Sequence, residues 1–170
     1  RSGISDGRSQ TQRRDMTNRI LRSGINGETE LLEDLADNLR SNSIINPNET
    51  KTIQASRAFG YYSSKKSDRK VKLSWWVRPF PGNFGDWLSP LIISHYGDCK
   101  ISFQTPTAPS KSTPKHLVAV GSIARFIKDS SVVVGTGISS HEYPINIKAK
   151  YFSVRGPITA EFLKTCGGPS

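Results

Sequence analysis

Four short segments of the chain combine glycine with side chains that could bind a ligand or move a proton. The first, GNFGD at 82–86, offers an amide at Asn83 and a carboxyl group at Asp86. An amide and a carboxylate both suit hydroxyl groups as partners, and a carboxylate can also accept a proton. The other three segments are GSIAR (121–125), GTG (135–137) and VRGPIT (154–159), which add hydroxyl and guanidinium groups.

Each of these segments stands at or just after the end of a short run rich in β-branched or aromatic residues, which is typical of a strand. Segments with helical character lie between the runs, and this alternation predicts right-handed crossovers and a parallel sheet. We therefore expect an α/β fold with a doubly wound, Rossmann-like sheet over residues 71–170. The expected strands are VKLSWWV, KISFQT, HLVAVGSI, SSVVVGTGI and KYFSVRG, and the expected helices are PLIISHY, ARFIKD and PITAEFLKTCGG.

Ligands of such sheets bind beyond the carboxyl ends of the strands, so the four segments are expected at one edge. Glycine at a strand-to-helix turn permits positive φ and lets backbone N–H groups approach a ligand. Arg125 is expected on the same edge. Asp86 is the candidate catalytic residue, and the candidate substrate-binding residues are Arg78, Asn83, Gly85, Gly121, Ser122, Gly135, Thr136, Gly137, Arg155 and Gly156.

Structural roles compete with these assignments. Asp86 could cap a helix, although Ser89 before Pro90 makes an equally good helix start. Arg155 could pair with a neighbouring carboxylate. Gly135-Thr136-Gly137 is only part of a dinucleotide fingerprint, because Ser140 stands where the third glycine belongs. Trp75 and Trp76 are expected on opposite faces of a strand and are more typical of a core than of a stacking surface.

The first 70 residues are expected to form a mostly irregular or helical extension. Residues 1–27 are rich in Arg, Ser and Gly and predict a flexible or peripheral segment. Leucines at helical spacing predict an amphipathic helix over about 28–41. SNSIINPNETKTIQ breaks that pattern, and the basic cluster SSKKSDRKVK is expected to be a solvated linker, with nucleic-acid contact as its alternative.

The 170-residue chain has a formal charge of +10, with the excess shared between residues 1–72 and 73–170. Such a balance favours anionic partners without selecting one of them. Cys99 and Cys166 stand far apart, and the three histidines have no ligand spacing, so we expect two buried thiols, no metal and no cofactor. No apolar run approaches the length of a membrane span.

Taken in order, the four segments resemble the motifs of the polysaccharide pyruvyl transferase family. Asn83-Phe84-Gly85-Asp86 is similar to that family's N-x-G-D loop, and Leu88 and Pro90 follow as in the family. Gly121-Ser122 and Gly135-Thr136-Gly137 are similar to its G-S and G-x-G motifs. The run from Ser153 to Thr159 is similar to its S-V-R-G-P-x-T motif, followed by Leu163 and Gly167. The resemblance covers about residues 71–170 and leaves residues 1–70 unexplained.

The resemblance implies one half of a glycosyltransferase-B-like fold, in a transferase that moves pyruvate from phosphoenolpyruvate onto a saccharide as a ketal. It implies a role in exopolysaccharide or cell-surface glycan synthesis, with a saccharide acceptor and a phosphoenolpyruvate donor as partners. The location implied is the cytoplasm, including the inner face of the membrane, or the Golgi lumen in a eukaryote. The chain corresponds to the amino-terminal, acceptor-side domain of such enzymes, so we expect residues 1–170 alone to be inactive without a C-terminal domain.

Two alternatives stay open. A sugar-nucleotide-dependent glycosyltransferase can share the same architecture and would consume a different donor. A non-catalytic basic module would bind nucleic acid or an acidic polymer, with an affinity that falls steeply with salt. No recognised nucleic-acid motif is present, so specific nucleic-acid binding is not expected.

Overall fold

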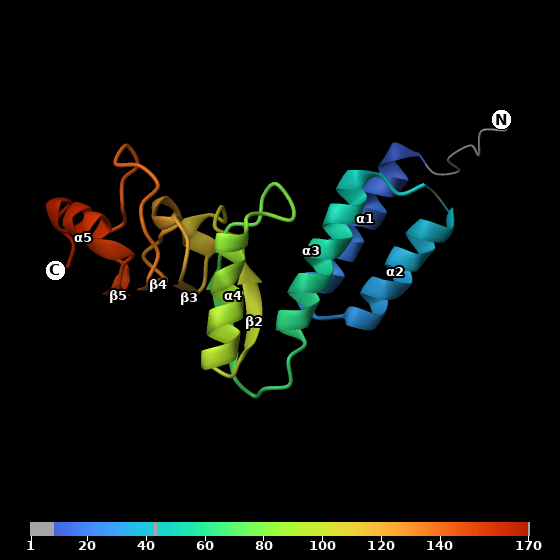
Figure 1. Cartoon of the computed structure of the whole chain (residues 1–170), viewed down its shortest axis with the longest axis horizontal. Helices are drawn as coiled ribbons and strands as arrows, with labels where there is room; N and C mark the ends of the chain where they lie inside the picture. The colour runs from blue at the N-terminus through green and yellow to red at the C-terminus, as the bar shows by residue number, and fades with distance from the viewer. Residues whose placement is uncertain (1–8, 43, 170) are drawn as a thin grey trace. The chain divides into compact units, whose positions relative to one another are not determined.

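The computed structural model describes residues 9–42 and 44–169 and divides into two compact units (Figure 1). The first unit contains the residues up to Lys65 together with Pro79–Pro81, and the second contains Lys66–Arg78 and the residues from Gly82 onward. The boundary therefore lies at Lys65, whereas the sequence pattern placed it at residue 70. None of the described helices is both long and apolar enough to cross a bilayer.

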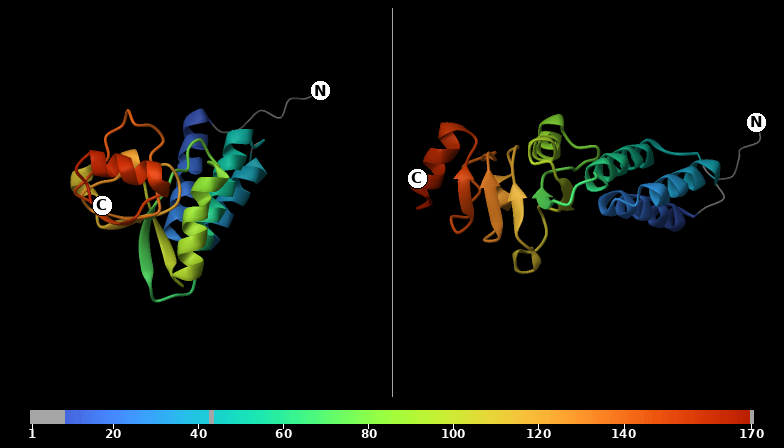
Figure 2. Two further views of the ribbon diagram at one scale, coloured as in Figure 1. Left: turned by 60° about the vertical axis from the view of Figure 1, so that its left-hand side comes forward. Right: turned by 90° about the horizontal axis from the view of Figure 1, so that it is seen from below.

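The first unit is a bundle of three helices: α1 (Gln10–Asn26), α2 (Thr29–Asn42) and α3 (Pro47–Ser63). Figure 2 shows the three helices side by side. The amphipathic helix expected over 28–41 is confirmed as α2, which buries Leu32, Leu35 and Leu39. These leucines form a cluster with Ile20 of α1 and Ile53 of α3.

Two helices of this unit were not expected from the sequence. Residues 1–27 were predicted to be flexible or peripheral, but from Gln10 onward they form a helix that buries Arg13 and Ile20, while residues 1–8 lie outside the described residues. Helix α1 begins with a capping box in which Ser9 accepts from the backbone N–H of Gln12 and the Gln12 side chain accepts from the Ser9 N–H. Helix α3 begins with a second capping box, between Asn46 and Glu49.

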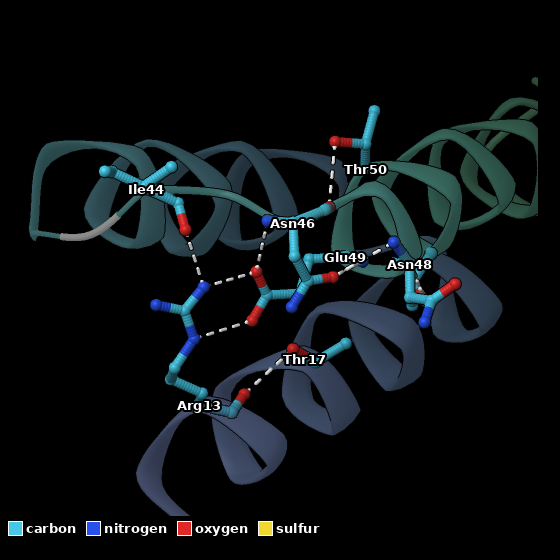
Figure 3. Close-up of polar contacts among 8 residues, drawn as sticks. Arg13, Thr17, Ile44, Asn46, Asn48, Glu49 and Thr50 are labelled. Carbon is cyan, nitrogen blue, oxygen red and sulfur yellow. Dashed lines mark hydrogen bonds and ion pairs between the residues drawn. The ribbon is translucent and has the colours of Figure 1, made fainter. Parts of the chain in front are cut away.

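A buried ion pair joins α1 to α3 (Figure 3). Arg13 donates from Nε to Glu49 Oε1 at 3.0 Å and from Nη2 to Glu49 Oε2 at 2.6 Å. The same Nη2 donates to the carbonyl oxygen of Ile44 at 2.7 Å, and Glu49 also accepts from the Asn46 backbone N–H at 2.9 Å. The charges of Arg13 and Glu49 are therefore matched and hydrogen-bonded, as burial of an ion pair requires.

The second unit is an α/β domain built on a five-stranded, wholly parallel sheet, as predicted. The strands are β1 (Lys70–Ser74), β2 (Lys100–Gln104), β3 (His116–Val118), β4 (Ser131–Val134) and β5 (Lys150–Ser153), in the order β2-β1-β3-β4-β5. Helix α4 (Phe84–Tyr96) connects β1 to β2, and α5 (Gly156–Thr165) follows β5. Figure 1 shows α4 alongside β2. The helix expected at 124–129 is a short 3₁₀ turn at Ala124–Phe126.

The two main helices of this unit pack on different sets of strand residues. Trp75, just after β1, packs against Trp87 of α4 and Phe103 of β2, with ring centroids 5.6 and 4.6 Å apart. Leu163 of α5 belongs to a separate cluster with Val133 of β4. Val133 is fully buried, but Val132 and Val134 are only partly so.

Candidate functional site

The strand order reverses at β1, because the chain crosses to one side of β1 to form β2 and then to the other side to form β3. Such a reversal separates the loops that follow the two central strands and opens a crevice between them. A cavity of about 350 Å³ lies there, lined by residues that follow β1, β3, β4 and β5. We call it the strand-end cavity. Its polar side chains come from Asn83, Asp86, Ser122, Arg125, Ser139 and Arg155.

The loop after β1 delivers Asp86 to this cavity by starting helix α4 earlier than expected. Asn83 is the N-cap, and its side-chain oxygen accepts from the Asp86 backbone N–H at 3.3 Å. Neither Asp86 nor Ser89 is the cap. Ser89, in the second turn, donates instead to the carbonyl oxygen of Val120 at 2.8 Å. Because Asn83 fills the capping role, the Asp86 carboxyl group is left to line the cavity.

The Asp86 carboxyl group is buried without a partner. Asp86 as a whole is only 5% exposed to solvent. Within residues 9–42 and 44–169, no hydrogen bond or ion pair engages its side-chain oxygens. Burial raises the pKa of Asp86, because the ionised form loses hydration that nothing in the cavity replaces. A carboxyl group with a raised pKa and no partner is suited to exchanging a proton with a ligand.

The loop after β3 is held by Thr136, which the sequence placed among the ligand-binding residues. The Thr136 side chain is fully buried and donates to the carbonyl oxygen of Gly121 at 3.1 Å, while it accepts from the Ile123 N–H at 3.3 Å. The Gly137 N–H donates to the same Gly121 oxygen at 2.9 Å. Thr136 thus acts by fixing the loop that carries Gly121 and Ser122, and its hydroxyl group does not line the cavity.

Arg155 is positioned by hydrogen bonding and packing against the same segment, Thr136-Gly137. Its backbone N–H donates to the carbonyl oxygen of Thr136 at 3.0 Å. A β-carbon at position 137 would lie 2.9 Å from Arg155 Nε, so Gly137 leaves the space that the Arg155 side chain occupies. Within the part of the chain that the structure describes, no carboxylate pairs with Arg155, so the alternative of a loop-tying ion pair gains no support.

Arg125 is held at the cavity by aromatic rings. Its guanidinium carbon lies 4.6 Å from the centroid of Phe126 and 4.8 Å from that of Tyr143. Such contacts orient a guanidinium group while leaving its N–H donors available. None of the ion pairs among the described residues involves Arg125. The cavity therefore offers two guanidinium groups to an anionic ligand and one carboxyl group to hydroxyl groups.

The structure brings together six of the residues proposed from the sequence: Asn83, Gly85, Asp86, Gly121, Ser122 and Arg155. The remaining five, Arg78, Gly135, Thr136, Gly137 and Gly156, are not among the residues that line the cavity. The other six lining residues were not proposed as site residues, although Arg125 was expected at the same edge: Trp76, Val120, Ile123, Arg125, Phe126 and Ser139. Position after a strand was a usable signal for Ser139, but nothing local distinguishes Trp76 from Trp75.

A buried Ser–His pair elsewhere in this unit has a structural role. His116 Nε2 lies 2.9 Å from Ser131 Oγ, and His116 Nδ1 lies 2.9 Å from the carbonyl oxygen of Pro114. Ser131 also accepts from the Lys128 N–H. Burial lowers the pKa of His116. Because His116 and Ser131 begin β3 and β4, the pair lies at the opposite end of these strands from the cavity.

No metal site accompanies the cavity in residues 9–42 and 44–169, where no three His, Cys, Asp or Glu side chains gather closely enough to hold an ion. Cys99 is buried as expected, but Cys166 is exposed, because it follows the last turn of α5. Comparison of the chain with protein-family models, with curated proteins and with solved structures gives no match.

Proposed function

We propose that the second unit is the acceptor-binding half of a transferase that moves pyruvate from phosphoenolpyruvate onto a saccharide as a cyclic ketal. The observation that carries the proposal is the convergence of three of the four strand-end motifs on one cavity. Asn83 and Asp86 come from the first motif, Gly121 and Ser122 from the second, and Arg155 from the fourth. The third motif, which contains Thr136, supports the loops of the other two.

The groups in the cavity suit the bond changes of this reaction. Two sugar oxygens become bonded to C2 of the enolpyruvyl group, its methylene carbon gains a proton to become a methyl group, and the bond from C2 to the phosphate oxygen breaks. One hydroxyl proton ends on the methyl group and the other leaves with phosphate. Asp86 is the group that accepts a hydroxyl proton, which its raised pKa favours.

The arginines serve the charged donor. Phosphoenolpyruvate carries a carboxylate and a phosphate, and guanidinium groups bind both with paired hydrogen bonds. Arg155 and Arg125 line the same cavity as Asp86. The leaving phosphate gains negative charge as its bond to C2 breaks, so a nearby guanidinium group stabilises the transition state more than the ground state.

The test is incubation of the complete gene product with phosphoenolpyruvate and a panel of saccharides. We expect release of one phosphate per pyruvate ketal formed, with the ketal methyl group followed by proton NMR. A parallel incubation with nucleotide sugars separates the two enzyme classes. Consumption of a nucleotide sugar, with phosphoenolpyruvate left intact, would replace the proposal with a glycosyltransferase.

A non-catalytic basic module makes a different prediction. Lys65, Lys66, Arg69 and Lys70 lie before and at the start of β1, whereas the cavity lies beyond the end of this strand. Such a module would bind a generic duplex with an affinity that depends on these four basic side chains and falls steeply with salt. It would be indifferent to substitution of Asp86. Duplex binding measured at two salt concentrations therefore distinguishes it from the transferase.

A further inference from the structure

The strand-end cavity contains an aromatic surface among its polar groups. Trp76 and Phe126 both line it, and their rings are stacked, with centroids 5.1 Å apart and planes 12° from parallel. We call this pair the Trp76 platform. The adjacent residue, Trp75, is 1% exposed and enclosed by Trp87 and Phe103, whereas Trp76 is only half-buried. The expectation that both tryptophans belong to the core is confirmed for Trp75 only.

The platform is fixed before any ligand arrives. Phe126 stacks on Trp76 and also lies under the Arg125 guanidinium, which in turn lies over Tyr143. Trp76 is the second residue after β1, an interior strand of the sheet, so its backbone continues from a strand that is paired on both sides. An aromatic ring held in this way loses little conformational freedom when a ligand covers it, and its contact area contributes more fully to affinity.

A flat apolar surface beside hydroxyl-binding groups matches the two-sided chemistry of a sugar ring. A pyranose presents C–H groups on a ring face and hydroxyl groups around its edge. The Asp86 carboxyl group and the Asn83 side chain, both of which line the cavity, suit the edge, and the Trp76 platform suits the face. An acyclic polyol has the same hydroxyl groups but no ring face.

We propose that Trp76 positions the acceptor by stacking on a pyranose ring, so that the hydroxyl groups at the ring edge reach Asp86. This inference rests on the proposed function and adds to it a recognition element that neither the motifs nor their order contain. Trp76 is therefore a specificity-determining residue. It selects closed-ring sugars with an accessible C–H face, and the proton transfer is left to Asp86.

Saturation-transfer NMR on the purified chain tests the inference with methyl gluco-, galacto- and mannopyranosides, and with glucitol as the acyclic control. We expect at least one pyranoside to receive saturation chiefly at its ring C–H protons, while glucitol receives little. Equal transfer to glucitol, transfer confined to the O-methyl group, or no binding of any pyranoside would overturn the inference.

Three substitutions complete the experiment. Trp76→Leu keeps apolar bulk but removes the aromatic face, so affinity for the pyranoside should fall about tenfold. Trp76→Phe keeps a smaller aromatic face and should retain affinity to within about threefold. Trp87→Phe makes the same chemical change as Trp76→Phe in the aromatic cluster around Trp75, outside the cavity lining, and should leave binding unchanged. A folded Trp76→Leu variant that binds the pyranoside as tightly as the wild type contradicts the inference. The saturation pattern of the wild-type chain tests the stacking on its own, without any variant.

The two proposals fail separately. If Trp76→Leu leaves ketal formation from phosphoenolpyruvate unaffected, the proposed role of Trp76 is contradicted while pyruvyl transfer is supported. If the complete gene product binds a pyranoside through Trp76 but leaves phosphoenolpyruvate unused, pyruvyl transfer is contradicted while the sugar-binding site is supported.

Discussion

Gly121 faces the Asp86 carboxylate so closely that no side chain fits between them. A β-carbon at position 121 would lie 2.7 Å from Asp86 Oδ1, nearer than real β-carbons approach. Gly121 also has a φ of 115°, a conformation that costs other residues strain. The loop after β3 and the first turn of α4 therefore fit each other only because position 121 has no side chain.

Replacement of this glycine should separate ligand binding from stability. Gly121→Ala should displace the Asp86 carboxyl group, so pyranoside affinity and transfer activity should each fall at least about tenfold. Strain at the positive φ should cost about 1–3 kcal/mol of unfolding free energy. Gly167→Ala is the matched control, because Gly167 has a φ of 82° with nothing near its would-be β-carbon. Equal binding by two folded variants would show that the close approach at Gly121 has no functional role.

Removal of the Asp86 charge should lower activity without lowering stability. Asp86→Asn keeps the shape of the side chain but cannot accept a proton, so transfer should fall by about 10²–10⁴-fold. Burial raises the pKa of Asp86 in the folded state. The folded protein therefore holds this proton to higher pH than the unfolded chain, and wild-type stability falls as pH rises from the ordinary pKa through the raised one.

The stability of Asp86→Asn should accordingly equal or exceed that of the wild type at about pH 7, and the difference should shrink toward about pH 4. Thermal melts across this range measure it. Asp68→Asn, at an exposed position before β1, is the control and should change neither activity nor melting temperature. A melting temperature that drops in step with activity would return Asp86 to a structural role.

The sheet and its edge could be predicted because apolar runs and strand-end glycines are local signals. The same reasoning could not rank Trp75 against Trp76, because their exposure depends on Trp87 and Phe126, which lie elsewhere in the sequence. It also assigned Thr136 to ligand binding, because a buried hydroxyl group that holds two loops looks the same in a sequence as one that faces a ligand.

The first unit was harder to predict for a different physical reason. Helix α2 has an apolar stripe and was found within a residue or two of its bounds. Helices α1 and α3 meet through close backbone approach at Gly24 and Ser56 and through the Arg13–Glu49 pair. Neither feature produces hydrophobic periodicity, so the segments read as polar and irregular.

The Arg13–Glu49 pair should make the first unit sensitive to acid. Burial raises the pKa of Glu49, but the hydrogen bonds from Arg13 and Asn46 and the charge of Arg13 outweigh it, so the pKa lies below its ordinary value. Glu49 therefore stabilises the fold above the ordinary pKa of Glu, about 4.3, and that stability is lost as pH falls. Glu49→Gln leaves Arg13 buried without a counter-charge and should cost about 3–5 kcal/mol at neutral pH.

Glu33 provides the control for this prediction. It pairs with Arg57 on the surface, and the hydrogen bond from Arg57 lowers the pKa of Glu33 as well. Because water screens this exposed pair, Glu33→Gln should cost about 0–1 kcal/mol. Hydrogen exchange of the α1 and α3 amides at about pH 7 and about pH 4 reports on this unit separately. Similar effects of the two substitutions would mean that the buried pair contributes no more than a surface pair.

The crossing of α1 and α3 should depend on the absence of a side chain at Gly24. A β-carbon at that position would lie 2.2 Å from the carbonyl oxygen of Ser56, which belongs to backbone and cannot rotate away. Alanine is normally the better helix former, by about 1 kcal/mol. Gly24→Ala should nevertheless destabilise the unit by about 1–3 kcal/mol, because the two helices must move apart.

Gly60→Ala makes the same substitution in the other helix, where the nearest atom is a Thr29 methyl carbon at 3.2 Å. A small movement of the Thr29 side chain relieves the contact. Because alanine is the better helix former, Gly60→Ala should leave the stability of the unit unchanged or slightly increased. Hydrogen exchange of α1 and α3 in the two variants measures the difference. Equal protection in both would mean that the helices can separate at Gly24 without cost, and that the bundle is held by the leucine cluster and the Arg13–Glu49 pair alone.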